Sequence, residues 1–495
     1  MTTHIHSGLL HREPPIFELS SPGRTGHALP APENLDCEGL PGHFLREKAP
    51  GLPELSEVEV VRHFVRLSQW NHCIETGMYP LGSCTMKYNP KINDAMSGLA
   101  GFTATHPLQE DEFVQGSLEL MYQLESALCR VSGFHSVTLQ PSAGANGEFT
   151  GLALIKKAID LRGQGARRKK VLIPDTAHGT NPASVVLNGF EPVLIVTGPE
   201  GVLLPDAVRP HLNDELAAIM VTNPNTLGIF ESHLKEISEL VHGAGGYVYM
   251  DGANFNAIMG KVRPADLGVD TMHFNLHKTF ATPHGGGGPG AGPVGCTEEL
   301  APYLPVPRVL RTNEGRYRLV SELPNTIGRV HPFFGNFSIL VRAFTYIMEN
   351  GGSGLKKVTE MAVLNANYVR SLLKDTLTVS VDVDTLHEVV FTDRDLKKET
   401  HVSTMDVAKR LLDFGFHPPT VYFPLIVPGA FMVEPTETES RIEIENFVET
   451  VKTIISEART DPEKVIGAPY RTGVGRLDET TAARKRILRW TPPQP

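Results

Sequence analysis

Asn275-Leu-His-Lys-Thr-Phe280 places a lysine directly after the apolar run Thr271–Asn275 and just before the glycine-rich segment His284–Gly292. A lysine so close to the end of a predicted buried strand is poorly placed to reach solvent. Burial and neighbouring cations lower the pKa of an ammonium group and make the amine a nucleophile for carbonyl carbons. Lys278 is therefore a candidate for a covalent bond to a carbonyl compound, although a lysine on a solvated loop gives the same local pattern.

A carboxylate lies at the end of the preceding apolar run. Asp251 closes the predicted strand Gly246–Asp251, and one further strand fits between it and Lys278. Enzymes that use pyridoxal phosphate need a carboxylate beside the pyridine nitrogen, because it keeps that nitrogen protonated and lets the ring accept electrons. Asp251 and Lys278 meet this need together, whereas Asp251 alone is equally well explained as the N-cap of a helix.

A turn of small residues, Gln140-Pro-Ser-Ala-Gly-Ala-Asn-Gly-Glu148, joins a predicted strand to a predicted helix over residues 148–162. Free backbone N–H groups and the helix dipole at such a junction favour a phosphate group. We expect Ser142, Ala143 and Gly144 to bind the phosphate of a cofactor, with a plain strand-to-helix turn as the alternative. The glycine-lysine signature of nucleoside-triphosphate loops is absent from this turn.

Three further polar residues follow predicted strands. His178, within Asp175–Ser184, is placed to stack on an aromatic cofactor near the substrate, although a hydrogen-bonded loop histidine is the common alternative. Thr226, within Thr222–Gly228, has a side-chain donor suited to a ring hydroxyl in a segment of turn residues. His277, next to Lys278, completes the candidate cofactor-binding residues.

One motif is misleading. Gly285, Gly287 and Gly290 match the spacing of a dinucleotide-binding fingerprint, but Pro289 interrupts the run and no helix pattern follows. We reject a nicotinamide site there and expect these glycines to allow close backbone approach beneath the cofactor or at a subunit interface.

The wider pattern predicts an α/β fold. Short apolar runs alternate with helical patterns between residues 111 and 300, as in a mainly parallel sheet covered by helices, which binds ligands at the carboxyl ends of its strands. The six strands predicted there are Ser136–Gln140, Lys170–Pro174, Pro192–Thr197, Ala217–Thr222, Gly246–Asp251 and Thr271–Asn275.

Four regions are expected along the chain. Residues 1–110, rich in Pro and Gly, predict an extended wrapping arm; residues 111–344 form the large domain, residues 345–480 a small α+β domain, and residues 481–495 a tail. The small domain is predicted from helices over Leu355–Leu373, Thr404–Phe414 and Ile442–Glu457, and strands over Thr378–Val383 and His387–Thr392.

Composition excludes several classes of protein. The formal net charge of −10 argues against general binding of nucleic acid, which requires a basic surface. No apolar run approaches the length of a membrane-spanning helix. The five cysteines are scattered without a CxxC pair, so neither a zinc site nor a disulfide framework is expected. Without a visible secretion signal, the cytoplasm is the expected location.

The five polar elements, in this order, resemble the aspartate-aminotransferase-like (type I) pyridoxal-phosphate enzymes. The sequences of these motifs are even more similar to those of glycine dehydrogenase (decarboxylating), the P-protein of the glycine cleavage system. The signatures are Met78–Lys87, Ala177–Ser184, Asp251–Asn254, Asn275–Phe280 with His284–Gly290, Val407–Leu412 and Glu434–Glu437, so the resemblance covers roughly residues 70–450.

The chain resembles only the C-terminal, cofactor-bearing half of the longer members of that family. This resemblance implies subunit 2 of a two-chain enzyme, with a pseudo-homologous subunit 1 as its partner. It also implies pyridoxal 5′-phosphate on Lys278, Asp251 at the ring nitrogen, His178 stacked on the ring and handling protons, and the Ser142–Gly144 turn on the phosphate. Glycine would lose carbon dioxide, and its aminomethyl group would pass to the lipoyl arm of H-protein.

Two alternatives remain at this stage. An aminotransferase or a cysteine desulfurase of the same fold would share the lysine, the aspartate and the phosphate turn. A non-catalytic subunit could keep the fold alone, but the presence of Lys278, Asp251 and His178 together speaks against it. The residue that binds the glycine carboxylate is not identified, and Arg311 and Arg329 are only guesses.

Overall fold

The computed structural model describes residues 13–27, 41–48, 50–285, 290–332 and 336–491. Its centre is a seven-stranded sheet in the order β1-β7-β6-β5-β4-β2-β3. All neighbouring strands pair in parallel except β7, which is antiparallel to both β1 and β6. The strands are β1 (Ser136–Thr138), β2 (Lys170–Pro174), β3 (Glu191–Ile195), β4 (Leu216–Thr222), β5 (Tyr247–Gly252), β6 (Thr271–Phe274) and β7 (Val294–Cys296).

Alternate residues of the central strands enter two different apolar clusters, one on each face of the sheet. In β5, Val248 and Met250 pack in the cluster that includes α4 (Gln115–Ser132) and α8 (Leu234–Gly243). Tyr247 and Tyr249 pack in the cluster on the other face, which includes α5 (Gly144–Leu161) and α6 (Thr180–Leu187). Both faces are covered, which explains why the strands read as continuous apolar runs.

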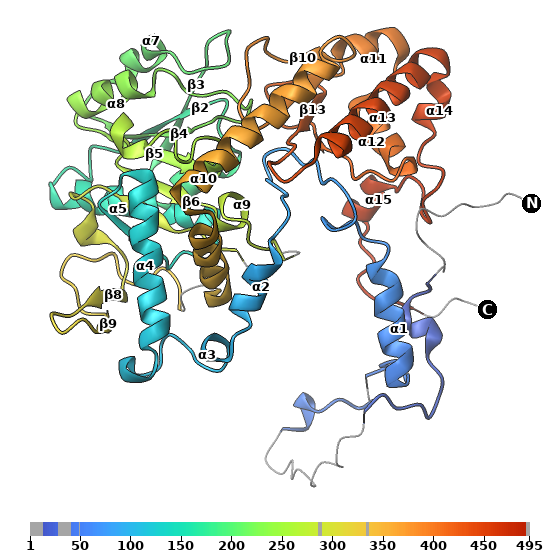
Figure 1. The fold of residues 1–495 in the computed structure, drawn as a ribbon, viewed down its shortest axis with the longest axis horizontal. Coiled ribbons are helices and arrows are strands. Elements are labelled where there is room, and N and C mark those ends of the chain that lie inside the picture. The colour runs from blue at the N-terminus through green and yellow to red at the C-terminus, as the bar shows by residue number, and fades with distance from the viewer. Residues whose placement is uncertain (1–12, 28–40, 49, 286–289, 333–335, 492–495) are drawn as a thin grey trace, which may run out of the picture.

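The small domain has a four-stranded antiparallel sheet in the order β10-β11-β13-β12, with helices on one side (Figure 1). Its core lies between these strands and α10, α12 and α13. The elements are β10 (Thr378–Val379), β11 (Val389–Thr392), β12 (Thr420–Val421), β13 (Ala430–Val433), α11 (Arg394–Thr400), α12 (Thr404–Asp413), α13 (Arg441–Thr460) and α14 (Pro462–Ile466).

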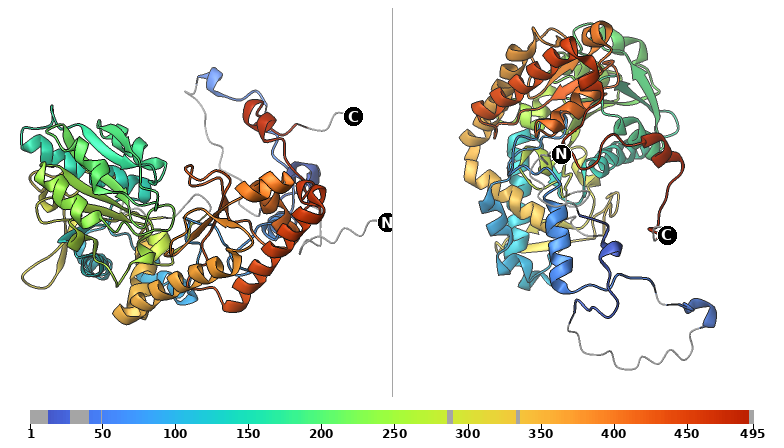
Figure 2. Two further views of the ribbon diagram at one scale, coloured as in Figure 1. Left: turned by 90° about the horizontal axis from the view of Figure 1, so that it is seen from above. Right: turned by 90° about the vertical axis from the view of Figure 1, so that its right-hand side faces the viewer.

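Helix α10 (Phe337–Leu373) connects the two domains, as seen from above in Figure 2. Gly351 breaks it, with φ 59° and ψ −178°. The predicted helix Leu355–Leu373 is the part after this break, and the predicted domain boundary at residue 344 falls inside α10. The predicted strand Thr378–Val383 is wrong beyond Val379, because the sheet pairing of β10 with β11 covers only two residues.

The remaining elements lie in the N-terminal region, in the large domain and the hairpin at its edge, and in the C-terminal region. Helix α1 (Glu57–Ser68) begins with a capping box between Ser56 and Glu59 and stands apart from the two domains in Figure 1. The ring of Phe17 stacks on that of Trp490, with centroids 5.1 Å apart, so the two ends of the described chain meet. The other elements are α2 (Lys91–Ser97), α3 (Ala100–Thr103), α7 (Pro205–Val208), α9 (Leu276–Thr279), β8 (Arg308–Arg311), β9 (Tyr317–Val320) and α15 (Glu479–Arg484), with single turns of 3-10 helix at Ile16–Leu19, Gly42–Phe44, Asp111–Phe113, Arg209–His211, Phe255–Ala257, Pro264–Leu267 and Ala301–Tyr303.

Candidate active site

Lys278 and Asp251 come from neighbouring strands of the central sheet. Asp251 lies in β5, paired in register with His273 of β6, and Lys278 lies in the short helix α9 that follows β6. Because β5 and β6 are parallel, their carboxyl ends meet at one edge of the sheet. The sequence predicted this juxtaposition.

Asp251 is buried in a network of donors. His273 Nε2 lies 3.3 Å from its Oδ1, Asn181 donates to Oδ2 at 3.0 Å, and the amide of Ala253 donates to Oδ1 at 2.9 Å. Burial alone would raise the pKa of Asp251, but His273, these two hydrogen bonds and nearby Lys278 outweigh it and hold the pKa below its ordinary value. Asp251 is therefore a fixed negative charge at the end of the sheet.

Lys278 is only partly buried, and its amine donates to the carbonyl oxygen of Ser83 at 2.7 Å. This partner comes from the N-terminal region and not from the sheet. A backbone carbonyl carries no full charge, so it orients the amine without fixing it as strongly as a carboxylate would.

His178 is held by a chain of side chains that leads into the large domain. Its Nδ1 lies 2.8 Å from the hydroxyl of Thr180, and that hydroxyl donates to Glu148 Oε1 at 2.7 Å. Ser184 donates to the other oxygen of Glu148 at 2.7 Å. The ring of His178 lies with its centroid 5.6 Å from that of Phe423. This chain fixes the orientation of the imidazole.

The predicted phosphate turn begins helix α5. Gly144 is its first residue and Ala143 its N-cap, and no side chain of the described residues caps this helix end. The amide of Ser142 donates to Asn146 Oδ1 at 3.1 Å. A Cβ atom on Gly144 would lie 2.6 Å from Asn275 Oδ1, so the turn passes very close to the segment that carries Lys278. Uncapped N–H groups at the start of a helix attract an anion.

Thr226 and His277 differ in the hydrogen-bonding capacity that their side chains can offer to a ligand. The hydroxyl of Thr226 is buried and donates to the carbonyl oxygen of Thr176 at 2.8 Å, so it has only lone pairs left to offer. His277 packs edge to face on His284, with ring centroids 5.2 Å apart. Burial, together with His284 and Lys278, lowers the pKa of His277 to about 3, so its imidazole is neutral.

Several buried polar atoms between residues 275 and 284 have no hydrogen-bond partner within the described ranges. Such atoms are rare in proteins, and a cluster of them beside an uncapped helix end fits a polar ligand that supplies the missing partners. Together with Asp251 and the amine of Lys278, they are suited to a phosphorylated aromatic aldehyde. These atoms are Asn275 Oδ1, His277 Nδ1, Thr279 Oγ1, Thr282 Oγ1 and His284 Nε2.

The residues predicted from the sequence do not include all those around Lys278. Buried Glu388 and Glu434, from the small domain, bind the backbone next to Ser83. Glu434 lies in the segment Glu434–Glu437, which contributes to the family resemblance, but no function was predicted for that segment. Arg311 and Arg329 are both exposed, and the hairpin that ends β8 at Arg311 lies at the edge of the large domain in Figure 1. Gly287 and Pro289 of the rejected dinucleotide motif lie outside the described residues.

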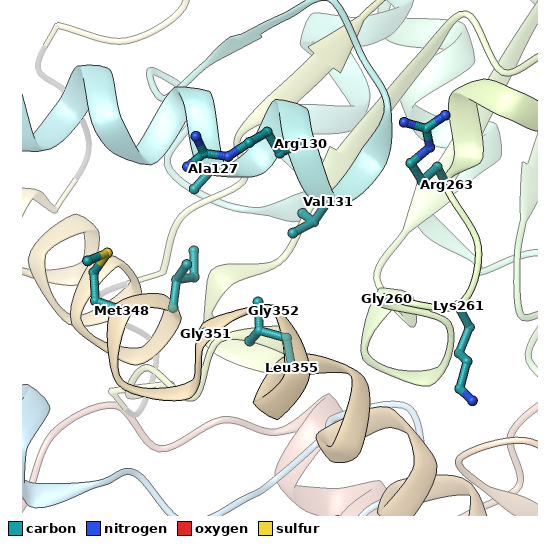
Figure 3. Close-up of a pocket in the computed structure, with 11 residues that line it drawn as sticks. Ala127, Arg130, Val131, Gly260, Lys261, Arg263, Met348, Gly351, Gly352 and Leu355 are labelled. Atoms are coloured by element: carbon teal, nitrogen blue, oxygen red, sulfur yellow. The ribbon is translucent and has the colours of Figure 1, made fainter.

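A separate pocket of about 540 Å³ lies between α4, the break in α10 and residues 260–263. Figure 3 shows Arg130, Lys261 and Arg263 at its rim, with Val131 and Leu355 among its apolar residues. None of the predicted site residues lines it. This pocket is therefore distinct from the site around Lys278.

The fold is shared with solved structures. A glycine decarboxylase (P-protein) of the glycine cleavage system, in inhibitor-bound form, superimposes with a TM-score of 0.69 at 20% identity, over 84% of this chain and 93% of that chain. Aspartate aminotransferase of Thermus thermophilus superimposes with a TM-score of 0.56 at 12% identity, over 77% and 100% of the two chains. The fold is the aspartate-aminotransferase-like (type I) fold of pyridoxal-phosphate enzymes, as predicted.

Sequence comparison then defines the family. A probable glycine dehydrogenase (decarboxylating) subunit 2 of Caldanaerobacter subterraneus subsp. tengcongensis is 52% identical over 482 residues, which cover 96% of this chain and 98% of the relative. Its counterpart in Pyrococcus abyssi is 52% identical over 482 residues, covering 97% and 96%. The model of the glycine dehydrogenase C-terminal domain matches residues 358–466. The chain belongs to the glycine dehydrogenase (decarboxylating) subunit 2 family.

Proposed function

We propose that this chain carries pyridoxal 5′-phosphate on Lys278 and decarboxylates glycine as the cofactor-bearing subunit of a glycine cleavage system P-protein. The name of its relatives, probable glycine dehydrogenase (decarboxylating) subunit 2, supports this proposal. The observation that carries it is the pairing of Lys278 and Asp251 at the ends of adjacent strands, beside an uncapped helix end. Bound pyridoxal phosphate supplies an aldehyde that links to amino groups and a ring that takes up the electron pair of the bond broken at the substrate carbon.

Each candidate residue has a separate task in this proposal. Lys278 would hold the cofactor through its amine, which has to be exchanged for the amino group of glycine. Asp251, with its lowered pKa, keeps a negative charge opposite a protonated ring nitrogen. Ser142, Ala143 and Gly144 hold the phosphate at the start of α5, while Thr226 and His277 contribute polar contacts. His178, fixed by Thr180 and Glu148, stacks on the ring and transfers protons near the substrate carbon.

The proposed partners follow from the products. Carbon dioxide leaves glycine, and the remaining aminomethyl group bonds to one sulfur of the oxidised lipoyl arm of H-protein. The electron pair left on the carbon forms that bond, and the other sulfur leaves as a thiol after it takes up a proton. Glycine dehydrogenase subunit 1 is the proposed second chain, in keeping with the subunit 2 name of the relatives.

We also infer that the enzyme works in the cytoplasm. The cysteines within the described ranges, Cys73, Cys84, Cys129 and Cys296, are all free thiols, which suits a reducing compartment. No helix in the described part of the chain is both long and apolar enough to cross a membrane.

Product analysis tests the proposal. The chain, loaded with pyridoxal phosphate and mixed with subunit 1 and lipoylated H-protein, is incubated with glycine labelled at its carboxyl carbon. We expect labelled carbon dioxide and a reduced lipoyl disulfide. Amino transfer to a keto acid would indicate an aminotransferase, release of sulfide from cysteine would indicate a desulfurase, and no reaction with any of these substrates would indicate a non-catalytic subunit.

A further inference from the structure

The segment Met78–Tyr88 joins the small domain to the lysine. The amide of Glu434 donates to the carbonyl oxygen of Pro80 at 3.2 Å, and Leu81 forms a β-bridge with Val433 at the end of β13. A Cβ atom on Gly82 would lie 2.1 Å from Cγ of Met432, so the segment lies very close against β13. It continues the small domain's sheet at the end of β13, which lies between β11 and β12.

The next four residues, Gly82-Ser83-Cys84-Thr85, form a turn in an unfavourable conformation, called here the 82–85 turn. Ser83 has φ 63° and Thr85 has φ 51°, in the left-handed region that residues other than glycine rarely adopt. The β-branched side chain of Thr85 makes this conformation especially unfavourable. Such a turn persists only where the surrounding structure holds it.

Two buried carboxyl groups hold the turn. Glu388 Oε2 accepts from the amide of Ser83 at 2.6 Å. Glu434 accepts twice from Thr85, at 2.9 Å from the amide and at 2.6 Å from the hydroxyl. Both glutamates are at most 1% exposed. Burying two carboxyl groups side by side is unfavourable, and the turn by itself does not require charged groups for its hydrogen bonds.

The turn is also the partner of Lys278. Ser83 donates its amide to Glu388 and accepts the amine of Lys278 on its carbonyl oxygen at 2.7 Å. A second contact lies one residue further along α9, where buried Lys87 donates to the carbonyl oxygen of Thr279 at 2.9 Å and to Glu437 at 2.8 Å. The small domain therefore reaches the helix of Lys278 through two connections, both carried by the 78–88 segment.

We propose that Glu388 and Glu434 are positioning residues, which hold the 82–85 turn and thereby fix the amine of Lys278 for its reaction with a carbonyl group. This inference rests on the proposed role of Lys278 as the cofactor lysine. The small domain thereby acts on Lys278 through contacts that no single sequence motif contains.

The two glutamates differ in how strongly their surroundings raise the pKa of the carboxyl group. Burial raises the pKa of Glu388 well above its ordinary value, with Glu434 adding to the effect, so Glu388 is neutral. Burial raises the pKa of Glu434 less, to about 6, because both bonds from Thr85 and the charge of Lys278 oppose it, which favours the anion of Glu434 over that of Glu388. The other titratable groups that face this pair are Cys84, His387 and Glu437.

The surroundings of Glu388 agree with a neutral carboxyl group. Its Oε1 has no hydrogen-bond partner among the described residues, and it lies 3.6 Å from Nε2 of buried His387, which also has none. Burial and nearby Lys278 lower the pKa of His387 to about 3, so the ring is neutral and has a lone pair to offer. A proton on Oε1 of Glu388 would face that lone pair.

The test measures the pKa of the Lys278 amine in the chain without cofactor, from the pH dependence of its acylation by acetic anhydride, followed by mass spectrometry. Glu434→Gln removes a negative charge close to the amine, so we expect its pKa to fall by about one unit. Glu388→Gln replaces a neutral group by a neutral group and should leave the pKa unchanged, whereas Glu388→Ala releases the turn. Glu439→Gln is the matched control, because Glu439 lies five residues after Glu434 and Lys278, which acts on the pKa of Glu434, is not among the groups that shift the pKa of Glu439.

A second readout uses the chain loaded with pyridoxal phosphate. We expect the pH midpoint of its visible absorbance to shift in the same direction in Glu434→Gln, and not in Glu439→Gln. Should Glu434→Gln fail to fold, Thr85→Val removes only the hydroxyl bond and should weaken cofactor binding several-fold. An unchanged amine pKa and an unchanged midpoint in folded Glu434→Gln, or unchanged binding in Thr85→Val, would overturn the inference. A wild-type chain that takes up no cofactor would refute the proposed function instead, and the acylation experiment would still decide the role of the glutamates.

Discussion

At the scale of single residues, the two charged groups of the site, Asp251 and Lys278, differ in how firmly their surroundings hold them. Asp251 has three polar partners and a lowered pKa, so it keeps its charge and its place. Within the described residues, the amine of Lys278 makes one hydrogen bond, to the backbone carbonyl of Ser83, which orients the amine but leaves it able to react. A fixed anion beside a movable amine suits a cofactor whose ring stays in place while its covalent partner changes.

Removal of Lys278 tests its proposed role as the residue that holds the cofactor. Lys278→Ala should abolish the visible absorbance that the wild-type chain acquires with pyridoxal phosphate, because the amine proposed to bond with the cofactor is removed. Lys235→Ala, an exposed lysine on α8, should leave the spectrum unchanged. Borohydride reduction followed by peptide mapping of the wild-type chain should find the cofactor on Lys278. A normal band in Lys278→Ala would show that another residue holds the cofactor.

The carboxylate has a different expected effect. Asp251→Ala should still bind pyridoxal phosphate but should decarboxylate glycine about 100-fold more slowly, because the charge that stabilises the protonated ring nitrogen is lost. Asp270→Asn provides the control, since Asp270 also pairs with a histidine, His242, at 2.8 Å, but lies before β6 at the opposite edge of the sheet. Near-normal turnover in Asp251→Ala would mean that another acid performs this task.

At the scale of elements, the local patterns found the strands and missed what depends on distant residues. The apolar runs located β1 to β6 to within a few residues, and strand order then brought Asp251 and Lys278 together. Strand β7 has only three residues after a glycine-rich segment, which is too short for a periodic pattern. The contacts of Glu388 and Glu434 with the 82–85 turn have no local signal in the sequence, because the partners are 305 and 349 positions apart in the chain.

The N-terminus of α5 is the proposed binding site of the cofactor phosphate, and a substitution at Gly144 tests it. Gly144→Val should weaken the binding of pyridoxal phosphate at least about tenfold, because its side chain would collide with Asn275 and displace the turn that holds the phosphate. Binding of pyridoxal, which lacks the phosphate, should change much less. Gly243→Ala is the control, since a Cβ atom there meets nothing within 4 Å. Equal losses for both ligands would place the phosphate elsewhere.

At the scale of the whole molecule, the chain presents apolar surface that its own domains do not cover. Helix α1 stands away from both domains (Figures 1 and 2). Its side chains Val58, Val61, Phe64 and Val65 are each more than half exposed. Val58 and Val61 are three residues apart and Val61 and Val65 four, so these three share one face of the helix, and Phe64 lies beside them. Contiguous exposed apolar residues mark a surface that another protein covers. This agrees with the wrapping arm predicted for residues 1–110, which stays a prediction.

The chain alone should therefore be nearly inactive in the exchange of bicarbonate with the carboxyl group of glycine, and should gain activity only with subunit 1 and lipoylated H-protein. The assay compares the chain alone, with each partner singly, and with both. Analytical ultracentrifugation of the lone chain should show self-association, which Val61→Ser with Phe64→Ser should reduce. Full exchange activity of the isolated chain would remove the case for an obligate second subunit, but would leave the role of Lys278 intact.

The 82–85 turn also has a consequence for the order in which the protein folds. Its hydrogen bonds to Glu388 and Glu434 join residues that are 305 and 349 positions apart in the chain. Contacts of such separation form late, because the entropy of closing so long a loop must be overcome first. During synthesis from the N-terminus, β6 and α9 leave the ribosome long before Glu434 does. The lysine is thus in place early, and its surroundings are completed only when the last strand of the small domain has formed.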